Sequence, residues 1–148
     1  MFRKFTLSHV QTELFDEHSF FKAFSNDMKC AKHSVIIESP YITARRAKEF
    51  SKLVSKIRNN LNITIHTRIP SHHDSNLTKQ ALLGIEILER IGISIIVCSD
   101  LRHRKFAIID DEILWEGSLN MLSHSNSREI MRRTRSTDLC SQMIDFTR

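Results

Sequence analysis

Short β-branched runs alternate with helical stretches through the first two-thirds of the chain, and this alternation constrains the fold most. Residues 34–38, 63–67 and 93–98 are rich in Val and Ile, and the segments between them carry apolar residues at helical spacing. Strands that alternate with helices in this way predict an α/β fold: a mixed β-sheet with helices on both faces. We expect residues 1–148 to form a single domain with one core.

Three helices are expected around these strands. The first covers residues 17–32 with Asp16 as its N-cap, the second begins after Thr43, and the third stops at Gly92. Their predicted apolar stripes are Phe20, Phe21, Phe24, Met28 and Ala31; Ala47, Phe50, Val54, Ile57 and Leu61; and Leu82, Ile85, Leu88 and Ile91. A lysine stripe on the second helix, at Lys48, Lys52 and Lys56, is expected to be a solvated face rather than a nucleic-acid surface.

Charge and cysteine usage narrow the class of protein. The net charge of +5 and pI of about 9.4 favour polyanionic partners such as nucleic acid or anionic lipid. Three widely spaced cysteines suit a reducing compartment, and Cys98, at the end of an apolar run, is expected in the core. Because charged residues interrupt the N-terminal segment and no long apolar stretch occurs, we expect a cytoplasmic protein with no membrane partner.

Apolar runs on both sides of residues 110–112 predict a β-hairpin. If Asp110 and Asp111 form the turn, Ser118 lies opposite His103; if the turn is one residue later, Asn120 takes that place. Either register puts polar side chains on one face of the hairpin, provided that Gly117 does not bulge the strand. These side chains are His103, Lys105, Ser118 and Asn120.

The four side chains on this face have the chemistry of a phosphate site that needs no metal. A neutral imidazole can act as nucleophile or base, while Lys, Ser and Asn donate hydrogen bonds to phosphoryl oxygens. Gly117 would let a ligand or another backbone approach closely. Taken singly, each residue also fits a solvated strand end, so the prediction rests on their joint pattern.

The joint pattern resembles a known family. The spacing His103-x-Lys105-x4-Asp110-x6-Gly117-Ser118-x-Asn120 is similar to the HxKxxxxD-x6-GSxN signature of the phospholipase D superfamily. The resemblance extends upstream through Ser39-Pro40-Tyr41 and downstream to Glu129, and covers residues 31–131. It implies the α-β-α sandwich of that superfamily.

The resemblance also implies a mechanism and an oligomeric state. His103 would form a covalent phosphohistidine, and a second histidine from another motif copy would protonate the leaving oxygen. Because the chain holds one copy, we expect a homodimer in which the two motifs meet at a two-fold axis. Lys105, Asn120 and Ser118 would hold the phosphate oxygens, so that neither a metal nor another cofactor is required.

Two acids receive different roles. Asp110 is expected to anchor the hairpin turn, too far from the phosphate to touch it, whereas the resemblance implies that Glu129 holds a catalytic imidazole in the right tautomer. The His72-His73-Asp74 run has no third ligand at a recognisable spacing, so a metal site there is not expected. His124 is expected to be a loop residue beside the site.

Small one-motif members of the superfamily that this chain resembles are typically nucleases. The resemblance therefore favours nucleic acid as the substrate, and DNA over RNA. Arg102 and Arg104 beside His103, and Arg132 and Arg133 after the motif, could contact a phosphate backbone, or could be solvated or paired with nearby acids. A separately encoded helicase or restriction partner is compatible with this prediction. The alternatives are a lipid hydrolase or transphosphatidylase, and a dimerisation module that binds nucleic acid without cleaving it.

Overall fold

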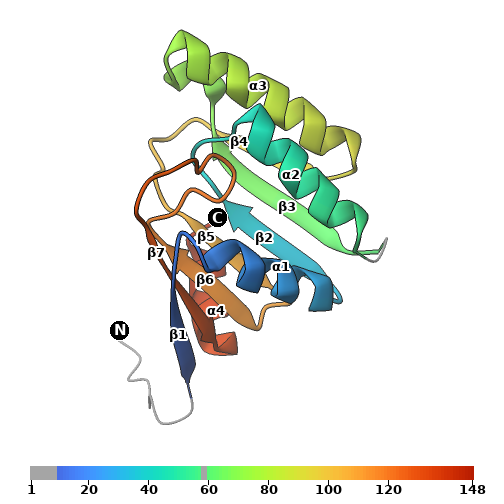
Figure 1. Ribbon diagram of the computed structural model, residues 1–148, viewed down its shortest axis with the longest axis vertical. Coiled ribbons are helices and arrows are strands. Elements are labelled where there is room, and N and C mark those ends of the chain that lie inside the picture. Colours follow the sequence, from blue (N-terminus) through green and yellow to red (C-terminus); the bar gives the residue numbers. More distant parts are fainter. Residues whose placement is uncertain (1–9, 58–59) are drawn as a thin grey trace.

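The computed structural model describes residues 10–57 and 60–148, and their strands form one mixed seven-stranded sheet (Figure 1). The strand order is β1-β7-β6-β5-β2-β3-β4, in which β2, β3 and β4 are parallel and the remaining neighbours are antiparallel. The strands are β1 Gln11–Asp16, β2 Ser34–Glu38, β3 Asn62–Arg68, β4 Ser94–Cys98, β5 Phe106–Ile109, β6 Ile113–Gly117 and β7 Ile130–Arg135. Arg3 and Lys4, two of the charged residues that interrupt the N-terminal segment, lie outside the described residues.

Helices cover both faces of the sheet, so the predicted α/β architecture is confirmed. Three helices pack on one face, and the fourth covers the opposite face of the central strands (Figure 1). They are α1 Phe20–Cys30, α2 Ala44–Ser55 and α3 Ser75–Arg90 on the first face, α4 Thr137–Asp145 on the second, and a short helix η2 Pro70–His72 before α3. Within the described residues, none of the helices has the length and apolar character needed to cross a bilayer.

The larger core is built around Trp115 of β6, which is fully buried. The rings of Phe15, Phe20 and Phe24 surround it at centroid distances of 5.0, 5.2 and 6.2 Å, the last two edge to face. Its indole N–H donates to Asp27 of α1 at 2.8 Å. This indole therefore fixes α1 against the sheet through both packing and a hydrogen bond.

Helix boundaries differ from the sequence predictions at two ends. Helix α1 begins after Ser19, and Asp16 is not its N-cap but the last residue of β1, an element that the sequence patterns did not reveal. The Asp16 carboxylate accepts from the backbone N–H groups of His18 and Ser19 and so closes the turn between β1 and α1. The predicted Thr43 cap of α2 is confirmed, although α2 ends at Ser55, before Ile57 and Leu61 of the predicted stripe.

The buried side of α3 was predicted only in part: Leu88 is buried and Ile85 is half-buried against the core, as expected, but Leu82 and Ile91 are not. Leu82 and Ile91 are 56% and 40% exposed, whereas the buried positions are Ala81, Gly84 and Leu88. Small residues face α2 because the two helices approach closely: a side chain at Gly84 would collide with Ile42 and with the backbone of Thr43.

Cys98 was expected in the core but is only half-buried, because β4 is an edge strand of the sheet. The buried cysteine is Cys140 of α4, and burial raises the pKa of its thiol to about 12. All three cysteines are free thiols.

The predicted hairpin is present, but both predicted registers are wrong. Ile109 pairs with Ile113, and Phe106 with Glu116, so the loop has three residues, 110–112, rather than two. Asp110 and Asp111 both adopt the left-handed conformation, with φ of 54° each, and the extra loop residue shifts the pairing by one. Continued along the strands, this register would place His103 and Ser118 on opposite faces.

The Asp110 carboxylate joins the hairpin turn to the start of β2. Its two oxygens accept from the backbone N–H groups of Lys32, His33 and Ser34 at 2.8, 2.7 and 3.0 Å. Partial burial on its own would raise the pKa of Asp110, but these three donors together lower it below the ordinary value. Asp110 therefore holds the β2–β5 pairing in register from the end opposite His103.

We predict that Asp110→Ala destabilises the fold by about 2–3 kcal/mol more than Asp111→Ala, since only Asp110 makes the charged hydrogen bonds. Asp111 has the same φ of 54°, so it controls for the strain of alanine in the left-handed region. Urea denaturation would measure both. Equal losses of stability would contradict the assignment.

The same carboxylate should make stability depend on pH. Because the pKa of Asp110 is lowered in the folded state, its contribution is fully present above the unfolded pKa of about 3.9 and is lost as the pH falls through the lower folded value. The stability gap between the protein and Asp110→Ala should therefore narrow in acid, which denaturation at a series of pH values can test.

Candidate active site

The motif residues gather at one edge of the sheet, where β2 and β3 end, β5 begins and β6 ends. Glu38 and Arg68 are the last residues of the two parallel strands, and Lys105 precedes β5 directly. Loops at the carboxyl ends of parallel strands are where α/β folds place their ligands. The site is thus assembled from strand ends and not, as predicted, from one face of the hairpin.

His103 and Lys105 are in direct contact. Lys105 Nζ lies 3.0 Å from His103 Nδ1 and donates to the His103 carbonyl oxygen at 2.7 Å. An ammonium has no lone pair, so Nδ1 is the acceptor and the ring is neutral in this arrangement. The charge of Lys105, followed by partial burial and then by the charge of Arg68, lowers the pKa of His103. The imidazole is therefore kept neutral, in the tautomer that carries its proton on Nε2.

Ser118 extends the pairing of β6 with β7 past the end of the strand. Its backbone N–H donates to the Ile130 carbonyl at 3.0 Å, and its hydroxyl accepts from the Ile130 N–H at 3.0 Å. Gly117 makes this approach possible, because a side chain there would collide with the Ile130 carbonyl and with Met131. The close approach expected at Gly117 is thus made by the backbone of β7.

Glu129 lies in this cluster but does not contact His103. The Ser127 hydroxyl donates to its carboxylate at 2.7 Å, and the nearby Ser118 hydroxyl, this hydrogen bond and the charges of His124 and Lys105 lower the pKa of Glu129. Among the described residues, Lys105 and not Glu129 is bonded to His103 Nδ1, so the expected carboxylate–imidazole contact is not formed. Glu129 faces the ammonium instead.

Glu17 positions Glu129 and was not identified from the sequence. Its carboxylate accepts from the Glu129 backbone N–H at 3.0 Å, and Arg128 lies 3.5 Å from it. Its side chain is only 9% exposed although it follows the edge strand β1 directly. Together with Ser118 and Ile130, these residues line an open hollow of about 290 Å³ beside the motif.

Asn120 and His124 are the ends of one turn after β6. The Asn120 carbonyl accepts from the backbone N–H of Ser123 and His124 at 3.2 and 2.7 Å, which fixes the turn. Within the described residues, the Asn120 side-chain oxygen is buried without a hydrogen-bond partner. The His124 ring lies 3.1 Å from the Ser127 carbonyl, in the loop beside Glu129, where it was expected.

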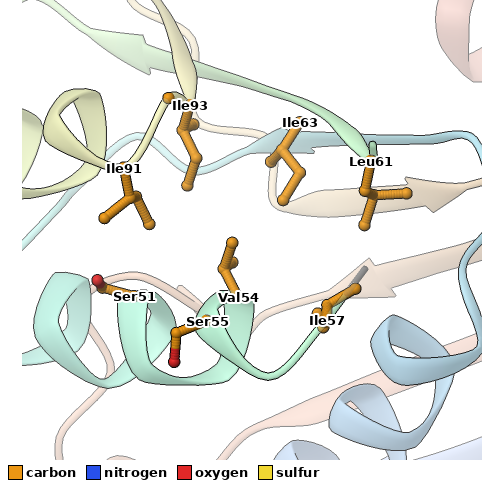
Figure 2. Close-up of a pocket in the computed structure, with 9 residues that line it drawn as sticks. Ser51, Val54, Ser55, Ile57, Leu61, Ile63, Ile91 and Ile93 are labelled. Carbon is orange, nitrogen blue, oxygen red and sulfur yellow. The ribbon is translucent and has the colours of Figure 1, made fainter. Parts of the chain in front are cut away.

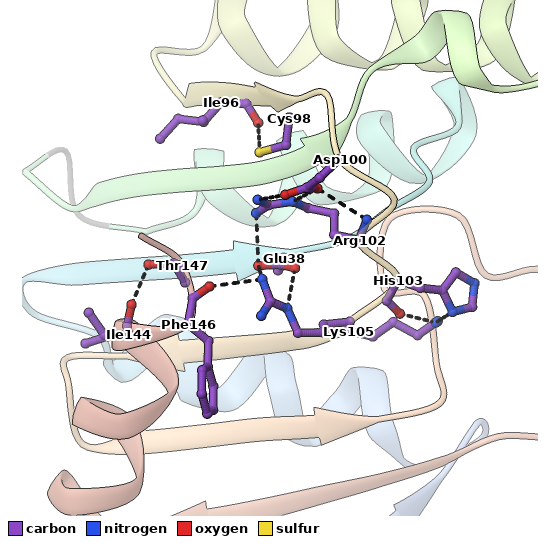
Figure 3. Close-up of polar contacts among 11 residues, drawn as sticks. Glu38, Ile96, Cys98, Asp100, Arg102, His103, Lys105, Ile144, Phe146 and Thr147 are labelled. Carbon is purple, nitrogen blue, oxygen red and sulfur yellow. Dashed lines mark hydrogen bonds and ion pairs between the residues drawn. The ribbon is translucent and has the colours of Figure 1, made fainter.

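Arg102 and Arg104 bind a buried acid on the other side of the segment that carries His103. The Glu38 carboxylate is fully buried and accepts from Arg104 at 2.9 Å, and Arg102 contacts it at 3.4 Å (Figure 3). Arg102 also forms a two-point ion pair with Asp100. In Figure 3 the side chains of His103 and Lys105 extend away from Glu38, so the arginines anchor the segment whose other side forms the site.

The arginines expected to contact nucleic acid therefore differ in how free their side chains are to bind a ligand. Arg102 and Arg133 have side chains only 11% and 16% exposed, and Arg133 forms a two-point ion pair with Asp27. These two are structural ion-pair partners, as the paired alternative predicted, although Asp27 and Glu38 lie far away in sequence. Arg104 is 42% exposed, and Arg132 lies on the exposed side of β7.

Two further residues surround His103 and were missed as site residues. The Tyr41 ring meets the His103 ring edge to face, with centroids 5.9 Å apart, and the charge of Arg68 acts on the same imidazole. Tyr41 follows Ser39-Pro40, and Arg68 ends the next parallel strand. Both residues lie at the ends of predicted parallel strands. Because the carboxyl ends of parallel strands meet at one end of the sheet, this position could have placed Tyr41 and Arg68 beside the motif.

A second hollow, of about 190 Å³, lies at the amino ends of β3 and β4, away from the motif (Figure 2). Isoleucine, leucine and valine side chains make up most of its lining, and Ser51 and Ser55 add two hydroxyls, but no histidine, cysteine, lysine or acid lines it. Among the residues that the structure describes, no three His, Cys, Asp or Glu side chains group closely enough to hold a metal ion.

Comparison with known proteins identifies the family. The family model described as "Cardiolipin synthase, PLD-like domain" matches residues 24–147, which is most of the chain. The chain belongs to the PLD-like domain family. This membership supports a phosphodiesterase-type activity for the cluster of PLD motif residues. A search of curated proteins finds none that matches the sequence.

Solved structures share the PLD fold. NucT from Helicobacter pylori is 21% identical with a TM-score of 0.71, and the match covers 93% of this chain and 92% of NucT. Nuc from Salmonella typhimurium, a phospholipase D family member, is 13% identical with a TM-score of 0.74, over 93% and 91%. Phosphatidylserine synthase from Haemophilus influenzae is 11% identical with a TM-score of 0.70, over 92% of this chain but 37% of that enzyme.

The charge environment of His103 gives a direct prediction. In an NMR titration of the histidine rings, the His103 midpoint should lie below 6.5, and Lys105→Met should raise it, because the largest repulsion of the imidazolium is removed. Lys48→Met, which removes an exposed lysine of α2, is the matched control and should leave the midpoint in place. A midpoint that does not respond to Lys105→Met would refute the contact.

Proposed function

We propose that this chain is a nuclease that cleaves phosphodiester bonds without a metal, through a phosphohistidine, at a site shared by two subunits. The observation that carries the proposal is the cluster of a neutral His103 with Lys105, Ser118 and Glu129 at one sheet edge. The positive charges of Lys105 and Arg68 both act on this imidazole. Such a set of groups stabilises the charge of a phosphoryl transition state directly.

The reaction runs in two steps on these residues. An oxygen of the substrate phosphate accepts the hydrogen bond that Lys105 otherwise donates to His103 Nδ1. The ring proton of His103 can then reside on Nδ1 instead of Nε2, which leaves the lone pair on Nε2. Nε2 attacks phosphorus, a P–N bond forms, the P–O bond to the leaving strand breaks, and the protonated His103 of the partner subunit donates a proton to that oxygen. That histidine then takes a proton from water, the water oxygen forms a new P–O bond, and the P–N bond breaks, which releases the phosphate end of the product and leaves His103 free.

Two features support a shared site. The chain carries one motif, while the mechanism needs two histidines. His103 is exposed, not enclosed, and large apolar side chains lie exposed around the motif: Leu101 is 76% exposed and Ile130 55%. Exposed apolar groups beside an open half-site are what a subunit interface would cover.

The distribution of exposed positive charge favours nucleic acid over lipid. The chain has a net charge of +5, and Arg128 and Arg132 are exposed beside the motif. Cations arranged in this way neutralise a phosphate backbone.

The decisive experiment incubates the protein in EDTA with DNA, RNA and vesicles that contain a fluorescent phosphatidyl lipid. We expect cleavage of nucleic acid in EDTA and a loss of about a thousandfold or more in His103→Asn, because the nucleophile is removed. His33→Asn is the matched control. It replaces an exposed histidine at the other end of β2 and should retain activity.

Three outcomes would count against the nuclease. Cleavage that requires magnesium would overturn the histidine mechanism. Turnover of the lipid alone would favour a phospholipase. Binding of nucleic acid with no cleavage at any concentration would favour a binding module.

A further inference from the structure

Three side chains form a second group next to His103 that the cleavage mechanism does not use. The Tyr41 ring lies 5.0 Å from the His73 ring, tilted by 38°, and 5.9 Å from the His103 ring, edge to face. Arg68 acts electrostatically on both histidines. The group therefore borders the position that a scissile phosphate would take.

Hydrogen bonds fix the backbone that carries both rings of this group. The Tyr41 carbonyl accepts from the Ser39 hydroxyl at 2.9 Å. The loop that carries His73 is fixed by the Thr78 hydroxyl, which lies 2.8 Å from the Pro70 carbonyl and 3.2 Å from the His73 carbonyl. A ring on a fixed backbone loses less conformational freedom when a flat ligand stacks on it, which lowers the entropic cost of binding.

Two polar atoms of the group lack partners. Arg68 Nε and His73 Nε2 are buried and, within the described residues, make no hydrogen bond. Buried polar atoms are normally satisfied, so a pair of unpaired atoms beside an aromatic surface points to a ligand with its own donors and acceptors. Burial, then the Arg68 charge, lowers the pKa of His73, so its ring is neutral at pH 7 and suited to stacking.

A nucleotide base has this combination of a flat aromatic face and polar edges. Bases stack on aromatic side chains in proteins that bind single strands, and arginine then meets a base edge or the adjacent phosphate. A base inside a duplex cannot stack on a protein ring, since both of its faces are covered and its edge is paired. Lipid head groups present no such face.

Building on the proposed nuclease function, we propose that Tyr41, His73 and Arg68 form a subsite for the nucleotide beside the scissile phosphate. The base stacks on the Tyr41–His73 pair, and Arg68 binds the polar edge or the flanking phosphate. The enzyme therefore selects single-stranded nucleic acid, or unpaired regions of a duplex, over continuous duplex.

The test measures binding of three fluorescent ligands to the full chain carrying His103→Asn, which prevents cleavage. The ligands are a single-stranded oligonucleotide, an abasic oligomer of the same length, and a duplex. We expect the single strand to bind best, and Tyr41→Ala or His73→Ala to weaken its binding about five- to a hundred-fold. The same changes should have a much smaller effect on the abasic oligomer.

Matched variants keep the result interpretable. His72→Ala, in the exposed neighbour of His73, should bind all three ligands as the parent does, and Tyr41→Phe, which keeps the ring, should retain the preference for bases. Arg68→Gln should weaken both single-stranded ligands and lower the salt dependence of binding. Equal losses on the base-containing and abasic oligomers, or a loss in His72→Ala as large as in His73→Ala, would overturn the subsite.

Failure of the subsite can be distinguished from failure of the nuclease. If the wild-type chain cleaves single and double strands equally well, and Tyr41→Ala reduces both to the same extent, the subsite is refuted and the nuclease stands. If the chain neither binds nor cleaves nucleic acid but turns over a phosphatidyl lipid, both proposals fail together.

Discussion

The site depends on a carboxylate that never faces it. Glu38, fully buried at the end of β2, binds Arg104 and Arg102, and these two arginines flank His103. A buried acid without these cations would be costly, so the pairing is enforced by desolvation. It fixes the segment before β5 at the edge of the sheet and leaves the side chains of His103 and Lys105 directed away from Glu38, into the site (Figure 3).

Most of the fold follows from local patterns, because each pattern reports on burial within one element. The three parallel strands, the Thr43 cap and the hairpin turn are of this kind. The register of the hairpin is not, since it depends on whether the loop holds two or three residues, and Asp110 and Asp111 can both adopt a left-handed conformation. The exposure of Leu82 could not be predicted from local patterns either, because it depends on how closely α3 approaches α2.

The candidate site likewise combines features that the sequence predicted with features that it did not. The motif string identified His103, Lys105 and Ser118, but for a geometric reason that the structure contradicts: they meet at strand ends and not across one face of a hairpin. Hydrogen bonds and ion pairs between residues far apart in the sequence could not be predicted from local patterns. Arg133 meets Asp27, and Glu17 meets Glu129, across more than 100 residues. Such contacts decide which cations remain free for a ligand.

The same geometry leaves the site incomplete. One exposed imidazole, bonded to a lysine, can attack phosphorus but cannot also protonate the leaving oxygen, and exposed Leu101 and Ile130 border it. We therefore propose that assembly controls activity: the isolated chain holds a poised nucleophile and a nucleotide-binding surface, while the acid comes from a second copy.

Subunit mixing tests this central claim most directly. Wild-type chain at a fixed amount is allowed to exchange subunits with increasing amounts of His103→Asn chain, a tag on one form verifies the exchange, and cleavage is measured in EDTA. If both histidines of a dimer are needed, activity per wild-type subunit falls in proportion to the wild-type fraction, to about a quarter at a threefold excess of the variant under random pairing. Activity per wild-type subunit that stays constant through verified exchange would show that each chain works alone and would contradict the shared site.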